Sequence, residues 1–83
     1  MNNKKIKTNE YRILRIKSLS ENNFGNVKSV GIKYQNNIGW IATVQFNKDS
    51  NIDYLAEDSD NPTEALRKLK NRIKRIINRY HNI

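Results

Sequence analysis

The 83-residue sequence has no cysteine, one proline, one histidine and three glycines, and these shortages exclude several classes of protein. Without cysteine there is no disulfide framework, no thiolate zinc site and no thiol nucleophile. No apolar run approaches the ~20 residues of a membrane span. No apolar core follows the charged residues at positions 1–7, as a secretory signal would require. We therefore expect one small cytoplasmic domain with no membrane association, no cofactor and no bound metal.

Charge is abundant but unevenly distributed along the chain, whose net charge is +8. Residues 1–48 hold nine Lys and Arg against two acids, residues 49–64 hold six acids and no base, and residues 65–83 hold seven bases and no acid. A codon bias toward Asn, Lys and Ile would account for part of the lysine excess. A domain this basic favours a polyanionic partner, with nucleic acid first among them.

The last 23 residues have the pattern of a long basic helix. Asn61 is a good cap, Pro62 suits the first helical position, and Glu64 suits the third. The apolar residues that follow are three and four positions apart, which places them on one stripe of a helix. That stripe contains Ala65, Leu66, Leu69, Ile73, Ile76, Ile77 and Tyr80. An amphipathic helix needs an apolar surface to cover this stripe, and the upstream strands are the candidates.

Alternation of apolar and polar residues predicts strands upstream of this helix, of which 39–46 is the clearest. The sequence predicts the fold class α+β: a three- to four-stranded antiparallel sheet packed on one C-terminal amphipathic helix, in the order β-β-β-(β)-α. Residues 1–9 are expected to be a flexible basic tail and 10–83 a single small domain. The expected segments are strand 11–19, loop 20–26, strand 27–34, turn 35–39, strand 39–46, strand 52–56 and acidic link 57–60.

Two segments resemble the DNA-binding domain of the plant ethylene-response-factor (Apetala) family and its integrase and phage relatives. The sequence 30–33 (VGIK), a turn and 39–44 (GWIATV) is similar to that family's R-G-V-x, turn, G-K-W-x-A-x-I. Residues 54–56 (YLA) followed by 61–65 (NPTEA) resemble its aromatic-Leu-Gly and T-x-E-E-A elements. The resemblance covers residues 29–75. The chain differs from the family at Val30, Thr43 and Gln45, where Arg or charged side chains are usual.

The resemblance implies that a three-stranded sheet crosses the major groove of DNA while the helix braces its back. It places Trp40, Ala42 and Val44 in the core. It assigns DNA-facing roles to Lys33, Gln35, Thr43, Gln45 and Tyr54.

The sequence therefore predicts a non-enzymatic nucleic-acid-binding domain, with duplex DNA favoured, that uses the open face of its sheet. Phosphate contacts give affinity and register, and the sheet would supply specificity. The predicted nucleic-acid-binding residues are Arg15, Lys17, Lys33, Gln35, Thr43, Gln45 and Tyr54. The predicted phosphate contacts are Lys28, Lys48, Arg67, Lys70 and Lys74.

Two other functions remain open from the sequence. The chain could be a small phage- or mobile-element-encoded inhibitor of a host nuclease or defence complex, using an acidic patch that mimics phosphates. That patch would comprise Asp53, Glu57, Asp58 and Asp60. The chain could also bind RNA. No catalytic set of residues is evident, and either a monomer or a homodimer fits the pattern.

Overall fold

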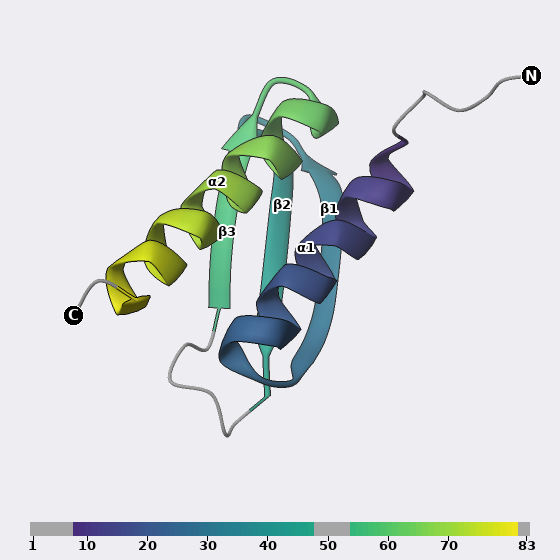
Figure 1. Ribbon diagram of the computed structural model, residues 1–83. Coiled ribbons are helices and arrows are strands. Elements are labelled where there is room, and N and C mark those ends of the chain that lie inside the picture. The colour runs from purple at the N-terminus through teal and green to yellow at the C-terminus, as the bar shows by residue number, and fades with distance from the viewer. Residues whose placement is uncertain (1–7, 48–53, 82–83) are drawn as a thin grey trace, which may run out of the picture.

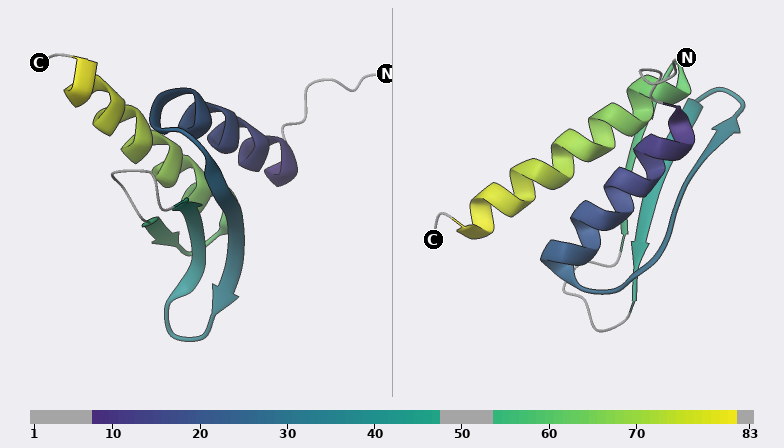
Figure 2. Two further views of the ribbon diagram at one scale, coloured as in Figure 1. Left: turned by 90° about the horizontal axis from the view of Figure 1, so that it is seen from below. Right: turned by 45° about the vertical axis from the view of Figure 1, so that its right-hand side comes forward.

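The computed structural model describes residues 8–47 and 54–81, with side chains described through Arg79. Three strands form one antiparallel sheet in the order β1-β2-β3, and both helices lie side by side on one of its faces (Figures 1 and 2). The elements are α1 (Asn9–Phe24), β1 (Val27–Gln35), β2 (Gly39–Phe46), β3 (Tyr54–Ser59) and α2 (Pro62–His81). The predicted α+β class, with an antiparallel sheet and a C-terminal helix, is confirmed. No helix in these ranges is long and apolar enough to cross a membrane.

The prediction of a first strand over residues 11–19 is wrong, because this segment belongs to helix α1. Thr8 caps this helix by accepting a hydrogen bond from the Tyr11 amide at 3.1 Å, and Gly25 ends it with a positive φ of 97°. The inward residues repeat every three or four positions, so Ile16 is 1% exposed while Leu14, which an alternating strand would place on the same face, is 61% exposed. The helical period therefore overrides the alternation, and the predicted loop 20–26 is largely the last turn of α1. Residues 1–7 of the predicted tail lie outside the described residues.

Helix α2 forms as its sequence predicts. Asn61 Oδ1 accepts a hydrogen bond from the Glu64 amide at 2.8 Å, which satisfies an otherwise unpaired amide of the first turn. The apolar stripe faces the sheet and α1, and its last predicted member, Tyr80, lies beyond the described side chains. The buried and half-buried members of the stripe are Ala65, Leu66, Leu69, Ile73, Ile76 and Ile77.

The register of the sheet separates its two faces. Val44 pairs with Val30 and with Leu55, and this row faces the helices. Thr43 pairs with Gly31 and with Ala56, and this row faces away from them. Strand β2 has the predicted bounds, whereas β3 runs to Ser59 and so includes most of the predicted acidic link.

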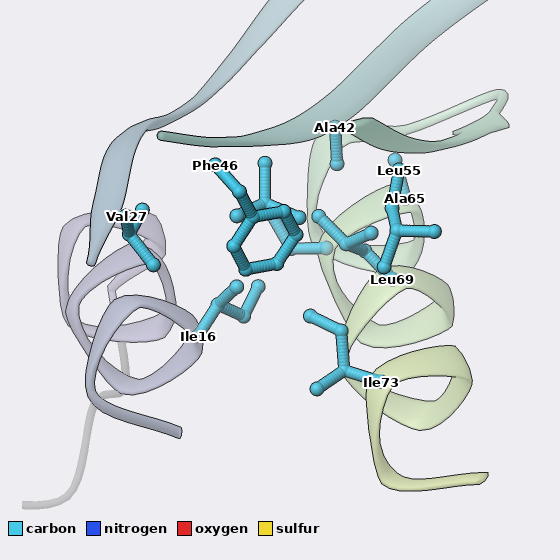
Figure 3. Close-up of a cluster of buried hydrophobic side chains, with 10 residues drawn as sticks. Ile16, Val27, Ala42, Phe46, Leu55, Ala65, Leu69 and Ile73 are labelled. Atoms are coloured by element: carbon cyan, nitrogen blue, oxygen red, sulfur yellow. The ribbon is translucent and has the colours of Figure 1, made fainter. Parts of the chain in front are cut away.

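The core lies between the sheet and the helix pair (Figure 3). Ile16 from α1 and Ile73 from α2 point toward Phe46 of β2, so both helices and the sheet contribute to one cluster. Phe24 adds an edge-on contact with Phe46, with ring centroids 5.7 Å apart. Burial of these side chains supplies most of the driving force for folding, at about 25 cal/mol per Å² of apolar surface. The helices are therefore held in a fixed position over the sheet.

The turn between β1 and β2 depends on two unusual backbone conformations. Asn37 has φ 72°, a left-handed value that Asn tolerates better than most residues. Gly39 has φ 108°, and a Cβ there would lie 2.6 Å from the Ser59 carbonyl oxygen. Only glycine therefore allows β3 to pack this closely on the start of β2.

Candidate nucleic-acid interface

Positive charge is concentrated on the two helices rather than on the sheet. The helices carry ten Lys and Arg side chains against three Glu, a net +7, with His81 taken as neutral. The three strands carry two Lys against one Glu and one Asp, a net charge of zero. Because both helices lie on the same face, the domain has a cationic helix layer and a nearly neutral open sheet face.

The cations of α2 form two rows along the helix. Arg67, Lys70 and Lys74 are three and four residues apart, so they share the side of α2 that faces α1. Lys68, Arg72, Arg75 and Arg79 form the second row, on the side nearer β3. We call these the α1-side row and the β3-side row.

Two members of the β3-side row are engaged in holding the sheet. Lys68 Nζ donates to the Asp58 carbonyl oxygen at 2.6 Å, and Arg72 Nη1 donates to the Ala56 carbonyl oxygen at 3.1 Å. Arg72 also pairs with the Glu57 carboxylate at 3.1 Å. In contrast, Arg75 and Arg79 make no hydrogen bond or ion pair with any other described residue.

Helix α1 turns two arginines toward α2. Arg12 and Arg15 line a groove between the helices of about 210 Å³, opposite Arg67 and Lys70. Ile16 and Leu66 close its floor, at 1% and 0% exposure. Tyr11 completes the lining, which contains four cations and no acidic side chain.

Several hydrogen bonds fix the geometry of this groove. Thr63 Oγ1 donates to Asn9 Oδ1 at 3.1 Å and so ties the N-terminal ends of the two helices together. Arg15 Nη1 donates to Tyr11 Oη at 3.1 Å, and its guanidinium lies 5.9 Å from the centre of the Tyr11 ring. Arg67 is held by a two-oxygen contact with Glu64, with both Nη2–O distances at 2.8 Å. The charged groups of Arg15 and Arg67 therefore have side-chain partners within the same helix.

The predicted sheet-face residues are only partly brought together. Thr43, Gln45, Lys33 and Tyr54 do share the open face, where Gln45 accepts a hydrogen bond from Ser29 at 3.2 Å. Gln35 is exposed at the end of β1.

The predicted strand 11–19 placed Arg15 and Lys17 on the sheet. This placement is wrong because both residues belong to helix α1. Arg15 faces α2, whereas Lys17 is exposed and does not line the groove. The open face then retains one described cation, Lys33, which is offset by Asp58 two strands away in the same row.

The predicted phosphate contacts group more closely. Arg67, Lys70 and Lys74 make up the α1-side row, and two of them line the groove. Lys28 is exposed in β1, at the register shift between Val27 and Ser29, on a different element. Lys48 lies outside the described residues.

The predicted acidic patch is divided between two faces. Glu57 points to the helix side and pairs with Arg72. Asp58 alternates to the open face, opposite Ile41, and Asp60 is exposed in the bend before α2. Asp53 lies outside the described residues. A continuous acidic surface is therefore not formed by the three described members.

Sequence reasoning missed Arg12, which is half-buried in the groove. Its spacing of three from Arg15 would have identified it once the segment was recognised as a helix. Within the described ranges, no group of three or more His, Asp or Glu side chains could hold a metal ion.

Scans of family models, curated proteins and solved structures give no match to this chain. The resemblance to the ethylene-response-factor domain therefore stays a prediction, and the residues themselves carry the functional argument.

Proposed function

We propose that this chain is a non-enzymatic nucleic-acid-binding domain, that duplex DNA is its favoured partner, and that the helix layer holds the phosphates. The observation that carries the proposal is the separation of charge, with +7 on the helices and zero on the strands. A polyanion gains affinity by releasing counterions where cations are concentrated. A neutral sheet face offers little of that gain.

The arrangement of the α2 cations supports a partner with regularly spaced phosphates. Arg67 and Lys74 are seven residues apart, or about 10 Å along the helix, and Lys68 and Arg79 are about 17 Å apart. Like charges at four-residue spacing destabilise an isolated helix by about 0.2–0.5 kcal/mol per pair. A bound phosphate backbone would relieve this repulsion.

The same surface favours a duplex over a single strand. Proteins that bind single strands combine a cationic groove with several aromatic side chains on which bases stack. Among the exposed aromatic side chains in the described part of the chain, Tyr11 is on the helix layer, while Tyr34 and Tyr54 belong to the strands. Rows of cations with a single described aromatic neighbour, Tyr11, suit the backbone of a paired helix.

Base contacts would come from the crest of α2, between the two rows. Asn71 and Asn78 are exposed there at a spacing of seven residues. An amide side chain can make two hydrogen bonds to adenine in the major groove. Any sequence preference is therefore expected to favour A/T pairs and to depend on these two residues.

The direct test removes one cation from each surface in turn, so that the two variants have the same net charge. Binding of duplex DNA, single-stranded DNA and duplex RNA is measured at two salt concentrations for wild type, Lys74→Gln and Lys33→Gln. We expect Lys74→Gln to weaken binding and to reduce the slope of log K against log salt by about one. We expect Lys33→Gln to leave both nearly unchanged.

Three results would count against parts of this proposal. Failure of the wild type to bind any of the three nucleic acids at low salt would remove the function itself. A larger loss from Lys33→Gln would return the contacts to the sheet face. Tighter binding of RNA than of DNA would change the partner but not the surface.

A further inference from the structure

The groove between α1 and α2 has a size and a lining that suit a small anion. Its volume of about 210 Å³ equals that of about seven liquid water molecules and is below the ~300 Å³ typical of sites for organic ligands. The floor residues Ile16 and Leu66 are almost unexposed, so the accessible lining comes from the charged groups, the aliphatic parts of the same side chains and the Tyr11 ring.

The electrostatic field in this groove has two sources of the same sign. Four cationic side chains from two different helices line it, and the Glu64 carboxylate that pairs with Arg67 offsets one of these charges. The positive ends of both helix dipoles lie at the same end of the domain, because Thr63 near the start of α2 bonds to Asn9 at the start of α1. An anion between the helices would therefore be attracted by side chains and backbone together.

The donor groups favour phosphate over other anions. The guanidinium groups of Arg12 and Arg15 are planar donors suited to phosphate oxygens, and Lys70 adds a compact charge. Arg67, whose Nε and Nη2 donate to Glu64, adds positive charge beside them. Arg15 donates to Tyr11, which reduces the side-chain ordering needed at that residue on binding.

We infer that the α1–α2 groove is a binding site for a single phosphate group, formed by Arg12, Arg15, Arg67 and Lys70. This assignment rests on the proposed function for the source of the phosphate, which is one backbone phosphodiester of the bound nucleic acid. That phosphate would fix the register of the duplex against the helix layer, while the outer cations act as point charges. It would also bridge the two helices and so stabilise the fold.

Thermal unfolding with inorganic phosphate tests the site without any nucleic acid. The probe is sodium phosphate, compared with sodium chloride and sodium acetate at the same ionic strength and pH. Three proteins are used: wild type, the groove variant Arg15→Gln with Lys70→Gln, and the charge-matched control Arg75→Gln with Arg79→Gln. Should the double groove variant fail to fold, exposed Arg15 is replaced alone, with Arg75→Gln alone as its control.

We expect phosphate to raise the Tm of wild type and control by about 5 °C beyond the effect of chloride, and to raise that of the groove variant little. No phosphate-specific rise in wild type, or an equal rise in all three proteins, would overturn the inference. An equal rise with acetate would also overturn it, because the site would then be one for carboxylates.

Duplex binding by the same three proteins separates this inference from the proposed function. Equal binding by groove variant and control, with no phosphate effect on Tm, would refute the groove site while the proposed function stands. A phosphate effect on Tm in a wild type that binds no nucleic acid would refute the proposed function and the backbone source, leaving a site for free phosphate. Stronger loss of binding in the groove variant, together with the loss of the phosphate effect, is the result we expect.

Discussion

The helix layer and the open face of the sheet are both accessible surfaces of one small domain, yet their charges differ by seven. The sheet face was the expected binding surface because the family resemblance implies it, and because an uncovered antiparallel face is either solvated or covered by a partner. Its described residues are instead small or uncharged along the central row of Gly31, Thr43 and Ala56. The comparison teaches that an uncovered face and a charged face can be two different surfaces of the same fold. For a polyanionic partner, the location of fixed charge is the more informative property.

The largest expected effect is the difference in duplex affinity between two variants that each lose two positive charges, one on the helix layer and one on the strands. Lys70→Gln with Lys74→Gln removes two helix-layer charges, and Lys28→Gln with Lys33→Gln removes two strand charges. We expect the helix pair to lose on the order of 100-fold in duplex affinity, because each charged hydrogen bond contributes about 1.5 kcal/mol or more. Fluorescence anisotropy with a labelled duplex measures both. Similar losses in the two variants would mean that only net charge matters.

A backbone substitution in the sheet should affect stability but not binding. Gly39→Ala introduces a Cβ close to the Ser59 carbonyl at a φ of 108°, and we expect the free energy of unfolding to fall by about 2 kcal/mol. Urea unfolding measures the change, and Gly31→Ala, where an added Cβ meets no atom within 4 Å, is the matched control. Equal destabilisation by both would show that the close packing of β3 on β2 has no special role.

Within the β3-side row of α2, Arg72 should act as a structural cation and Arg75 as a binding cation. Arg72→Met removes the hydrogen bonds to Ala56 and Glu57, so we expect the free energy of unfolding to fall by about 1.5 kcal/mol. Arg75→Met breaks no described contact and should change stability by less than about 0.5 kcal/mol while weakening duplex binding. Denaturant unfolding and anisotropy of the same two samples test this. A larger loss of stability in Arg75→Met than in Arg72→Met would refute this distinction between structural and binding cations.

The smallest expected effect is a gain in stability. Ser20 of α1 is completely buried, and its hydroxyl has no hydrogen-bond partner among the described residues. Ser20→Ala removes a desolvated polar group and improves helix propensity, so we expect the free energy of unfolding to rise by about 1 kcal/mol with duplex binding unchanged. Ser18→Ala, at an exposed position of the same helix, controls for propensity. A loss of stability would show that the hydroxyl is satisfied in solution.

Helix α2 and strand β2 could be predicted because their signals are local and long. A cap, a proline and an uninterrupted stripe define α2, and strict alternation defines β2. Helix α1 was missed because the apolar residues in Ile13 to Lys17 fit both the two-residue period of a strand and the 3.6-residue period of a helix. The cap at Thr8 and the burial of Ile16 decide between them, and burial is a property of the whole fold.

The candidate site could be predicted in part for a related reason. Arg67, Lys70 and Lys74 were among the predicted phosphate contacts, and helical spacing alone places them on one side of α2. Arg12 and Arg15 could not be assigned to the same groove, since that requires knowing that α1 packs beside α2 with both N-termini at one end. Charge counts along the sequence identify a basic domain but not the surface on which the charge gathers.

The contacts of Lys68 and Arg72 with β3 also bear on how this chain behaves when it is concentrated. β3 is an edge strand, and unpaired edge carbonyls can recruit a strand from another molecule and so start aggregation. Here the Ala56 and Asp58 carbonyls are already occupied by long cationic side chains from the same chain. A strand joining at β3 would have to displace both and would then lie beside their charges. Further growth of the sheet is thus directed to β1, the edge at the opposite side of the molecule.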